Sequence, residues 1–228
     1  MVNLGRRIIP QTMAIKNRTN RVDRMNFNEI LRDKRLGIQT IGRDDTHADE
    51  HHSPYEPTPY CVLDRMAENN VFDHISHLID FGCGKGRVGF YLAEKYGIRT
   101  TGIEVEKVFY KAAIKNLSHF SRKALVHFEN CPAETRLIPI DADAFFFFRP
   151  FSEIILRRVM HNILGSYYEY PRLMRFIFYY INASYASYLE NINEISTVLE
   201  KDCRDLFQSK DQKDKFIVYE AKPLLNNT

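Results

Sequence analysis

The feature that most constrains the fold of this chain is a glycine-rich stretch at residues 77–87, His-Leu-Ile-Asp-Phe-Gly-Cys-Gly-Lys-Gly-Arg. It begins as a short apolar run, turns at Gly82, Gly84 and Gly86, and continues at once with helical spacing of apolar residues. This order predicts a strand, a tight turn and a helix start, where free backbone N–H groups face a ligand. A dinucleotide fingerprint would have its third glycine where Arg87 stands, so the spacing argues against a nicotinamide or flavin site and favours a ligand without a pyrophosphate.

A second acid follows the next expected strand. Residues 100–103 read as that strand, and Glu104 comes directly after it, twenty residues beyond Gly84. In a βαβ unit, an acid at this strand end accepts hydrogen bonds from the ribose hydroxyls of a bound nucleoside. The two motifs together predict a nucleoside-containing ligand at the carboxyl ends of the first two strands.

The glycine-rich stretch with its leading acid, followed by Glu104, resembles the first two motifs of class I S-adenosylmethionine-dependent methyltransferases. The resemblance covers about residues 55–221 and implies a Rossmann-like fold with S-adenosyl-L-methionine as cofactor. The cofactor contacts that it implies here are Asp80, Gly82, Cys83, Gly84, Gly86 and Glu104.

The segment Tyr55-Glu-Pro-Thr-Pro59 precedes the glycine-rich stretch. Thr58 can cap a following helix that has Pro59 at its first position. The segment also looks like the one that closes over the cofactor in some methyltransferases that modify protein lysines. Tyr55 and Thr58 are therefore candidate cofactor contacts.

A third strand, expected over residues 124–128, leads to Asn130 and Cys131. In the resembled fold, the adenine is read at this position by a small polar side chain and by backbone N–H groups. Asn130 and Cys131 fit this role, although the Asp-Ala pair that is common in the family is missing.

The rest of the chain continues the alternation of strand and helix. Four consecutive phenylalanines at residues 145–148 suit a central strand of a parallel sheet that helices cover on both faces. The further elements expected are a helix over 152–164 ended by Gly165, a strand over 175–181, a helix over 183–190, and a closing strand pair, 195–199 and 216–220, joined by a charged linker. We therefore expect an α/β fold with a seven-stranded, mostly parallel, doubly wound sheet whose last strand is antiparallel.

The fourth strand ends in Phe148-Arg-Pro-Phe151, where the methyl acceptor of such an enzyme is expected. The segment resembles a divergent form of the Asn-Pro-Pro-Phe/Tyr motif of enzymes that methylate planar amino groups, so Arg149, Pro150 and Phe151 are the candidate catalytic residues. Arginine has donors and no acceptor, so Arg149 cannot replace the asparagine carbonyl. Two alternatives remain: Arg149 pairs with Asp141 or Asp143, or it binds a carboxylate or phosphate of the substrate.

Charged residues are distributed unevenly along the chain. Residues 1–46 hold ten Lys and Arg against five Asp and Glu, giving +5, whereas residues 47–228 hold 22 against 24, giving −2. We expect a basic, partly helical extension over residues 1–54, with a helix near residues 25–36, and a cofactor-binding domain over 55–228. Nucleic acid could bind only through the basic arm.

The four cysteines are scattered, which suits neither a disulfide framework nor a zinc site and is typical of the cytoplasm. No apolar run approaches the length that spans a bilayer. His47, His51 and His52 have a spacing that could hold a metal, but their polar loop favours solvated side chains, and we expect no metal.

These features predict a methyltransferase whose acceptor is undetermined, with a protein or small-molecule amine favoured over nucleic acid. The alternative, from outside the enzymes, is a module that binds the cofactor without catalysing a reaction. Arg149 is the residue that favours this alternative. A nicotinamide oxidoreductase fits the glycine spacing poorly.

Overall fold

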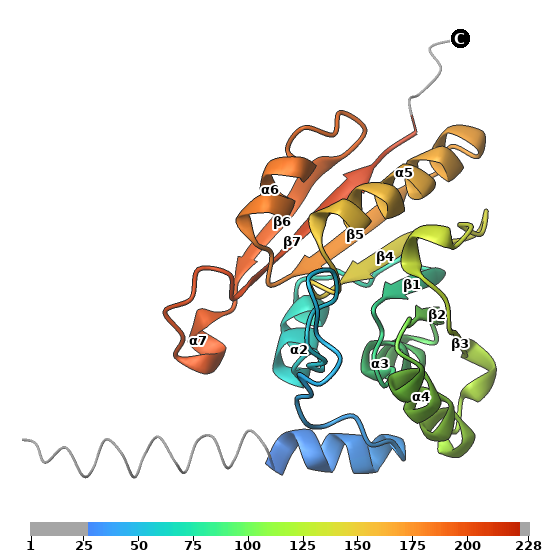
Figure 1. The fold of residues 1–228 in the computed structure, drawn as a ribbon, viewed down its shortest axis with the longest axis vertical. Coiled ribbons are helices and arrows are strands. Elements are labelled where there is room, and N and C mark those ends of the chain that lie inside the picture. Colours follow the sequence, from blue (N-terminus) through green and yellow to red (C-terminus); the bar gives the residue numbers. More distant parts are fainter. Residues whose placement is uncertain (1–26, 224–228) are drawn as a thin grey trace, which may run out of the picture.

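The computed structural model of the chain describes residues 27–223. They form a seven-stranded sheet in the order β3-β2-β1-β4-β5-β7-β6 (Figure 1). The strands are β1 (His77–Phe81), β2 (Arg99–Ile103), β3 (Val126–Glu129), β4 (Ala144–Phe147), β5 (Met174–Tyr179), β6 (Ser196–Asp202) and β7 (Lys215–Ala221). Residues 1–22, the basic arm, lie outside the described residues, as does part of the helix expected near residues 25–36, of which residues 27–36 are helical.

The first five strands of the chain are parallel to one another, and β7 is antiparallel to both β5 and β6. The helices that follow residues 27–36 are α2 (Tyr60–Glu68), α3 (Arg87–Tyr96), α4 (Lys107–His119), α5 (Glu153–Glu169), α6 (Ala183–Leu189) and α7 (Arg204–Phe207). This topology confirms the predicted seven-stranded, doubly wound α/β fold with an antiparallel last strand.

The four consecutive phenylalanines show how the sheet is covered. In β4, Phe145 and Phe147 face the core under α5 and α6, while Phe146 faces the core under α2 and α3. All three side chains are almost completely buried, as expected for a strand between β1 and β5 with helices on both faces. A third cluster joins α3, α4 and β3 around Phe90 and Phe128.

One helix boundary differs from the expectation. Gly165 does not end α5, which runs for 17 residues to Glu169. The apolar stripe of the helix continues past the glycine to Tyr167, whose hydroxyl donates a 2.8 Å hydrogen bond to the carbonyl of Lys222. Packing of this stripe outweighs the weak helix propensity of one glycine. In addition, the expected linker over residues 200–215 contains the end of β6 and all of α7.

Across residues 27–223, no helix combines the length and the apolar character needed to cross a bilayer.

Two glycines allow the effect of backbone conformation on stability to be measured apart from the effect of packing. A Cβ at Gly165 or at Gly97 would meet no atom within 4 Å, but Gly97 ends α3 with φ +69° and Gly165 lies inside α5. Gly165→Ala is therefore expected to raise the free energy of unfolding by roughly 0.5–1 kcal/mol. Gly97→Ala is expected to lower it by about 1 kcal/mol, because alanine strains the left-handed conformation. Urea titrations of both variants check this, and a destabilising Gly165→Ala would contradict the regular helix.

Candidate functional site

A narrow cavity lies at the carboxyl ends of β1, β2 and β4, with a volume of about 90 Å³. Eleven of the thirteen predicted site residues line it. They are Tyr55, Thr58, Asp80, Gly82, Cys83, Gly84, Glu104, Cys131, Arg149, Pro150 and Phe151. The turn after β1, the end of β2 and the turn after β4 thus meet at one edge of the sheet, as the parallel topology requires.

The turn after β1 packs tightly against its neighbours. Gly82 and Gly84 have φ values of +72° and +56°, in the left-handed region that glycine adopts without strain. A Cβ at Gly82 would overlap Pro150, and a Cβ at Gly84 would overlap the ring of Tyr55. Absence of a side chain at Gly84 therefore makes room for Tyr55 in this structure, rather than leaving a gap for a ligand.

The other two predicted residues, Gly86 and Asn130, stand behind the cavity wall. Gly86 precedes α3, and a Cβ there would overlap the ring of Phe128. The Asn130 amide donates hydrogen bonds of 2.8 and 2.9 Å to the carbonyls of Glu104 and Val105. Asn130 thereby holds the turn after β2, and the structure does not place its side chain on the cavity surface.

Two buried acids face the cavity. The carboxylate of Glu104 accepts 2.8 Å hydrogen bonds from the backbone N–H groups of Gly84 and Glu106, which fixes it at the end of β2. Burial raises the pKa of Glu104 above its ordinary value even so. Burial, and then the negative charge of Glu104, raise the pKa of Asp80 to about 8. The Asp80 carboxyl has no hydrogen-bond partner within residues 27–223, so the site holds a carboxyl that lacks a compensating cation.

Residues 51–58, which we call the strap, cross the mouth of the cavity. The strap pairs with the turn after β4, because Ser53 N–H donates to the carbonyl of Pro150 and Ser152 N–H donates to that of His51. Typical small-molecule pockets measure about 300–1,000 Å³. The cavity is smaller, so a nucleoside-sized ligand requires the strap to shift outward.

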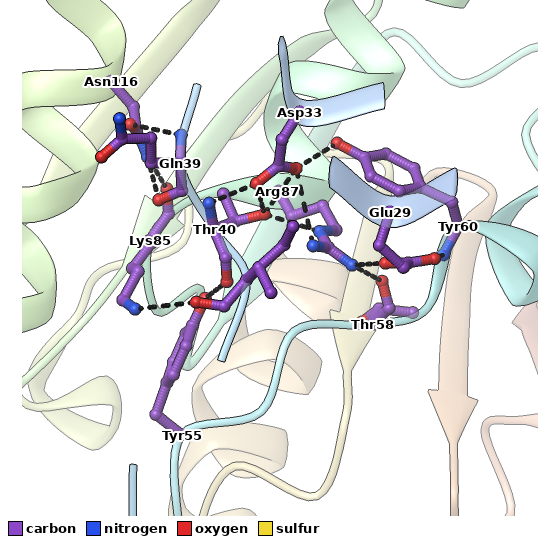
Figure 2. Close-up of polar contacts among 11 residues, drawn as sticks. Glu29, Asp33, Gln39, Thr40, Tyr55, Thr58, Tyr60, Lys85, Arg87 and Asn116 are labelled. Carbon is purple, nitrogen blue, oxygen red and sulfur yellow. Dashed lines mark hydrogen bonds and ion pairs between the residues drawn. The ribbon is translucent and has the colours of Figure 1, made fainter. Parts of the chain in front are cut away.

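Tyr55 anchors the strap against the glycine turn. Its ring stacks on Phe109 with centroids 4.7 Å apart, and the ammonium group of Lys85 lies 4.4 Å from its centroid. Its hydroxyl donates to the carbonyl of Thr40 (Figure 2). Tyr55 thus links the strap to α4 and to the segment after the N-terminal helix.

Arg87, the first residue of α3, is the centre of a buried polar network that the sequence did not reveal (Figure 2). Its side chain is 3% exposed and forms ion pairs with Glu29 and Asp33 of the helix over residues 27–36. Its other donors reach the hydroxyl of Thr40 at 2.7 Å and the carbonyl of Thr58 at 3.2 Å. One guanidinium therefore joins α3, the N-terminal helix and the strap.

Tyr60 completes this network. Its ring lies under the Arg87 guanidinium, 4.4 Å from centroid to Cζ, and its hydroxyl donates a 2.8 Å hydrogen bond to Asp33. Asp33 also accepts from the backbone N–H and the hydroxyl of Thr40. Glu29 and Asp33 stand four residues apart in a basic segment, and this spacing of two acids on one helix face is the signal that could have indicated the network.

The histidine-rich loop contributes to the cavity but forms other pairs. His47 and His52 line the cavity wall. His47 lies 3.4 Å from Glu106, and His52 lies 3.1 Å from Asp49. In the described part of the chain, no three His, Cys, Asp or Glu side chains are arranged to hold a metal ion.

Arg149 pairs with neither Asp141 nor Asp143, contrary to one of the two alternatives. Both acids precede β4 and Arg149 follows it, so an extended strand at about 3.3 Å per residue separates them. Asp141 instead pairs with Arg99 and His77, and Asp143 accepts from the backbone N–H groups of Ser76 and His77.. The Arg149 guanidinium lies over Tyr180, 5.1 Å from its centroid, and its backbone has φ +39°.

The buried network is expected to be a major source of stability. Arg87→Met would leave two largely buried carboxylates without their cation, and should lower the free energy of unfolding by roughly 3 kcal/mol or more. Arg43→Met is the matched control, because Arg43 pairs with Asp45 and Glu56 at an exposed site and should change it by less than about 1 kcal/mol. Chemical denaturation measures both. Equal effects of the two variants would contradict the role of Arg87.

Comparison with known proteins supports the fold. No protein-family model matches the chain, and no curated protein sequence does. Among solved structures, a human methyltransferase 10 domain containing protein superposes with a TM-score of 0.60 at 14% identity, over 89% of this chain and 97% of that one.

Two further structures were solved with S-adenosyl-L-homocysteine. The RNA methyltransferase from Salinibacter ruber has a TM-score of 0.54 at 20% identity, covering 76% of this chain and 98% of that one. The N-terminal domain of human METTL16 has a TM-score of 0.53 at 15% identity, covering 83% of this chain and 77% of that one. The chain has the fold of class I S-adenosylmethionine-dependent methyltransferases.

Proposed function

We propose that the protein is a methyltransferase that uses S-adenosyl-L-methionine. The observation that carries the proposal is the buried Glu104 at the end of β2, hydrogen-bonded to the N–H of Gly84 in the turn after β1. An acid in this position serves the ribose of a nucleoside cofactor. The likeness to methyltransferase structures solved with the demethylated cofactor supports the same function.

The residues present fit this cofactor. Each Glu104 oxygen accepts one backbone N–H and keeps a lone pair for a ribose hydroxyl. Asp80 supplies a carboxylate for a cationic group, and the cofactor carries two, an ammonium and a sulfonium. Cys131 and Phe109 give an apolar wall near the end of β3 and the start of α4, which suits the adenine.

The cofactor supplies an activated methyl group on its sulfonium. Glu104 and Asp80 would hold the cofactor, which would supply this methyl group to an acceptor that offers a lone pair. The protein binds and orients both molecules and excludes water. Closure of the strap over the cavity serves the exclusion of water, and Arg149, Pro150 and Phe151 form the wall that faces the acceptor.

The acceptor class is the open part of the proposal. The strap sequence supports a protein or small-molecule amine, and the balance of charge in residues 47–228 disfavours nucleic acid. A nucleic-acid methyltransferase is the second candidate, because the similar Salinibacter ruber structure is that of an RNA methyltransferase. A silent cofactor-binding module is the third, because Arg149 offers only donors at the end of β4.

The direct test is the identity of any co-purified ligand. The protein is denatured by heat, and the supernatant is examined by mass spectrometry for S-adenosyl-L-methionine and its demethylated product. Turnover is then followed as release of S-adenosyl-L-homocysteine against cell extract. Tight cofactor binding without any turnover would favour the silent module.

Cofactor affinity should depend on Glu104 and Gly84. Glu104→Ala removes the acceptors for the ribose and should weaken binding of S-adenosyl-L-homocysteine by about 1–3 kcal/mol, with Glu104→Gln in between. Gly84→Val should abolish binding, because a β-branched residue strains the backbone at φ +56° and so distorts the turn whose N–H group holds Glu104. Calorimetric titration measures each affinity. Wild-type affinity in either Glu104→Ala or Gly84→Val would show that the site lies elsewhere.

Affinity for S-adenosyl-L-methionine should rise with pH. The pKa of Asp80 is about 8 without ligand, so below that pH the carboxyl must release a proton before it can pair with a cation. We expect the affinity to increase up to about tenfold per pH unit between pH 6 and 7.5. Asp80→Asn should flatten most of this slope. A steep slope that survives in Asp80→Asn would contradict the assignment.

The same carboxyl should have the opposite effect on the cofactor-free protein. Its pKa rises from 3.8 in the unfolded chain to about 8 in the folded one, so the folded state keeps a proton that the unfolded state releases. Its contribution to stability is complete below about pH 4 and is lost as the pH rises towards 8. Asp80→Asn should therefore be more stable than wild type at pH 8 in the absence of cofactor, as thermal unfolding will show.

A further inference from the structure

A second cleft borders the cofactor cavity, with a volume of about 340 Å³. Its wall combines the ends of β4 and β5, part of the strap and the linker between β6 and β7. Ser53, Phe148 and Arg149 belong to the walls of both hollows. A molecule bound in this cleft would therefore lie next to the cofactor, where a methyl acceptor has to be.

The cleft is rich in aromatic side chains. Phe148, Tyr179, Tyr180 and Phe207 line it, and the ring of Phe148 lies 4.7 Å from Tyr179 and 6.3 Å from Tyr180, centroid to centroid. Such walls favour a flat, apolar ring that stacks offset or edge-on. The volume lies within the range of small-molecule sites, about 300–1,000 Å³.

Most charges in the wall already have partners. Glu56 pairs with Arg43 at 3.3 Å, and Asp211 accepts a 2.6 Å hydrogen bond from the hydroxyl of Tyr180 and lies 3.6 Å from Lys213. Asp214 is the remaining acid in the wall. The wall has three acids against the two cations Arg43 and Arg149, and this balance disfavours a polyanionic chain such as RNA, which would bring several phosphates.

Two arginines, Arg43 and Arg149, line the cleft. Arg43 pairs with Asp45 and Glu56, whereas Arg149 has no carboxylate partner in the described part of the chain. The Arg149 Cζ lies 5.1 Å from the centroid of the Tyr180 ring, to which Lys213 Nζ also comes within 5.0 Å, and the guanidinium N–H groups remain able to donate. Its left-handed backbone, at φ +39°, is uncommon for a residue other than glycine and marks a position held by its surroundings. A guanidinium fixed in this way suits a carboxylate or phosphate, since both offer two acceptor oxygens.

We propose that this cleft binds the methyl acceptor, and that the acceptor is a small aromatic molecule whose single anionic group, a carboxylate or phosphate, is held by Arg149. The ring packs against Phe148 and Tyr180, and the anionic group fixes which edge of the ring turns towards the cofactor cavity. That the bound molecule accepts a methyl group rests on the proposed methyltransferase function. Binding of the molecule in the cleft does not depend on turnover.

The test uses four fragments that each carry one polar group on a benzene ring: benzoate, phenyl phosphate, neutral benzamide and cationic benzylamine. Their affinities for the full-length protein are measured by ligand-observed NMR, with and without S-adenosyl-L-homocysteine. We expect the preferred anion to bind about tenfold more tightly than benzamide. Comparison of benzoate with phenyl phosphate shows which anion the cleft takes.

Three variants locate the effect. Arg149→Gln should abolish the preference for anions, and Arg149→Lys should restore part of it. Arg157→Gln, outside the cleft and paired with Glu153, should leave it within about twofold. Tighter binding of benzylamine than of the anions would overturn the proposal in favour of an amine site. An anion preference that persists in Arg149→Gln, or tight binding of a short RNA in place of every fragment, would overturn it as well.

The two proposals fail in different ways. Absence of binding of S-adenosyl-L-homocysteine to the wild-type protein would overturn the methyltransferase assignment, whatever the fragments do. Normal cofactor binding without an Arg149-dependent preference for anions would overturn only the assignment of the cleft.

Discussion

The buried guanidinium of Arg87 is the interaction on which the shape of the site depends. Removing an arginine from water is costly, and the cost is offset only where every donor finds a well-placed acceptor. Here the acceptors come from Glu29, Asp33, Thr40 and Thr58, which belong to the N-terminal helix and the segment that leads into α2. Arg87 therefore joins the start of α3 to the N-terminal helix and to the strap, and the strap and the glycine turn together line the cavity.

The two acids of the cavity show a conflict between stability and binding. Glu104 is partly compensated by two backbone N–H groups, but Asp80 is buried beside it without a hydrogen-bond partner in residues 27–223. The raised pKa of Asp80 expresses the free energy that its charge would need in the empty site. The proposed cofactor, which carries an ammonium and a sulfonium, would remove this penalty as it binds. The same arrangement thus weakens the empty protein and selects for a positively charged ligand.

The features that could be predicted from the sequence are those that depend on a local pattern of residues. Alternating apolar runs and the phenylalanines of β4 indicated the sheet, and the glycine turn with Glu104 indicated the cavity, since these signals are short-range. Gly165 was interpreted wrongly because burial of Tyr167 extends α5 beyond it. Arg87 was seen only as a missing glycine, since an ion pair with Glu29, 58 residues away, leaves no local signature.

The residue at the end of β4 determines which kind of group can be fixed there. Arg149 stands where the resembled motif has an asparagine, and its distance from Asp141 and Asp143 along β4 leaves its charge free for other partners. An amide at this position offers both a donor and an acceptor, whereas a guanidinium offers donors alone. Any group that it fixes must therefore bring lone pairs, and preferably negative charge. Because Arg149 and Phe148 border both hollows, the same two residues that would bind such a group would also align it with the cofactor cavity.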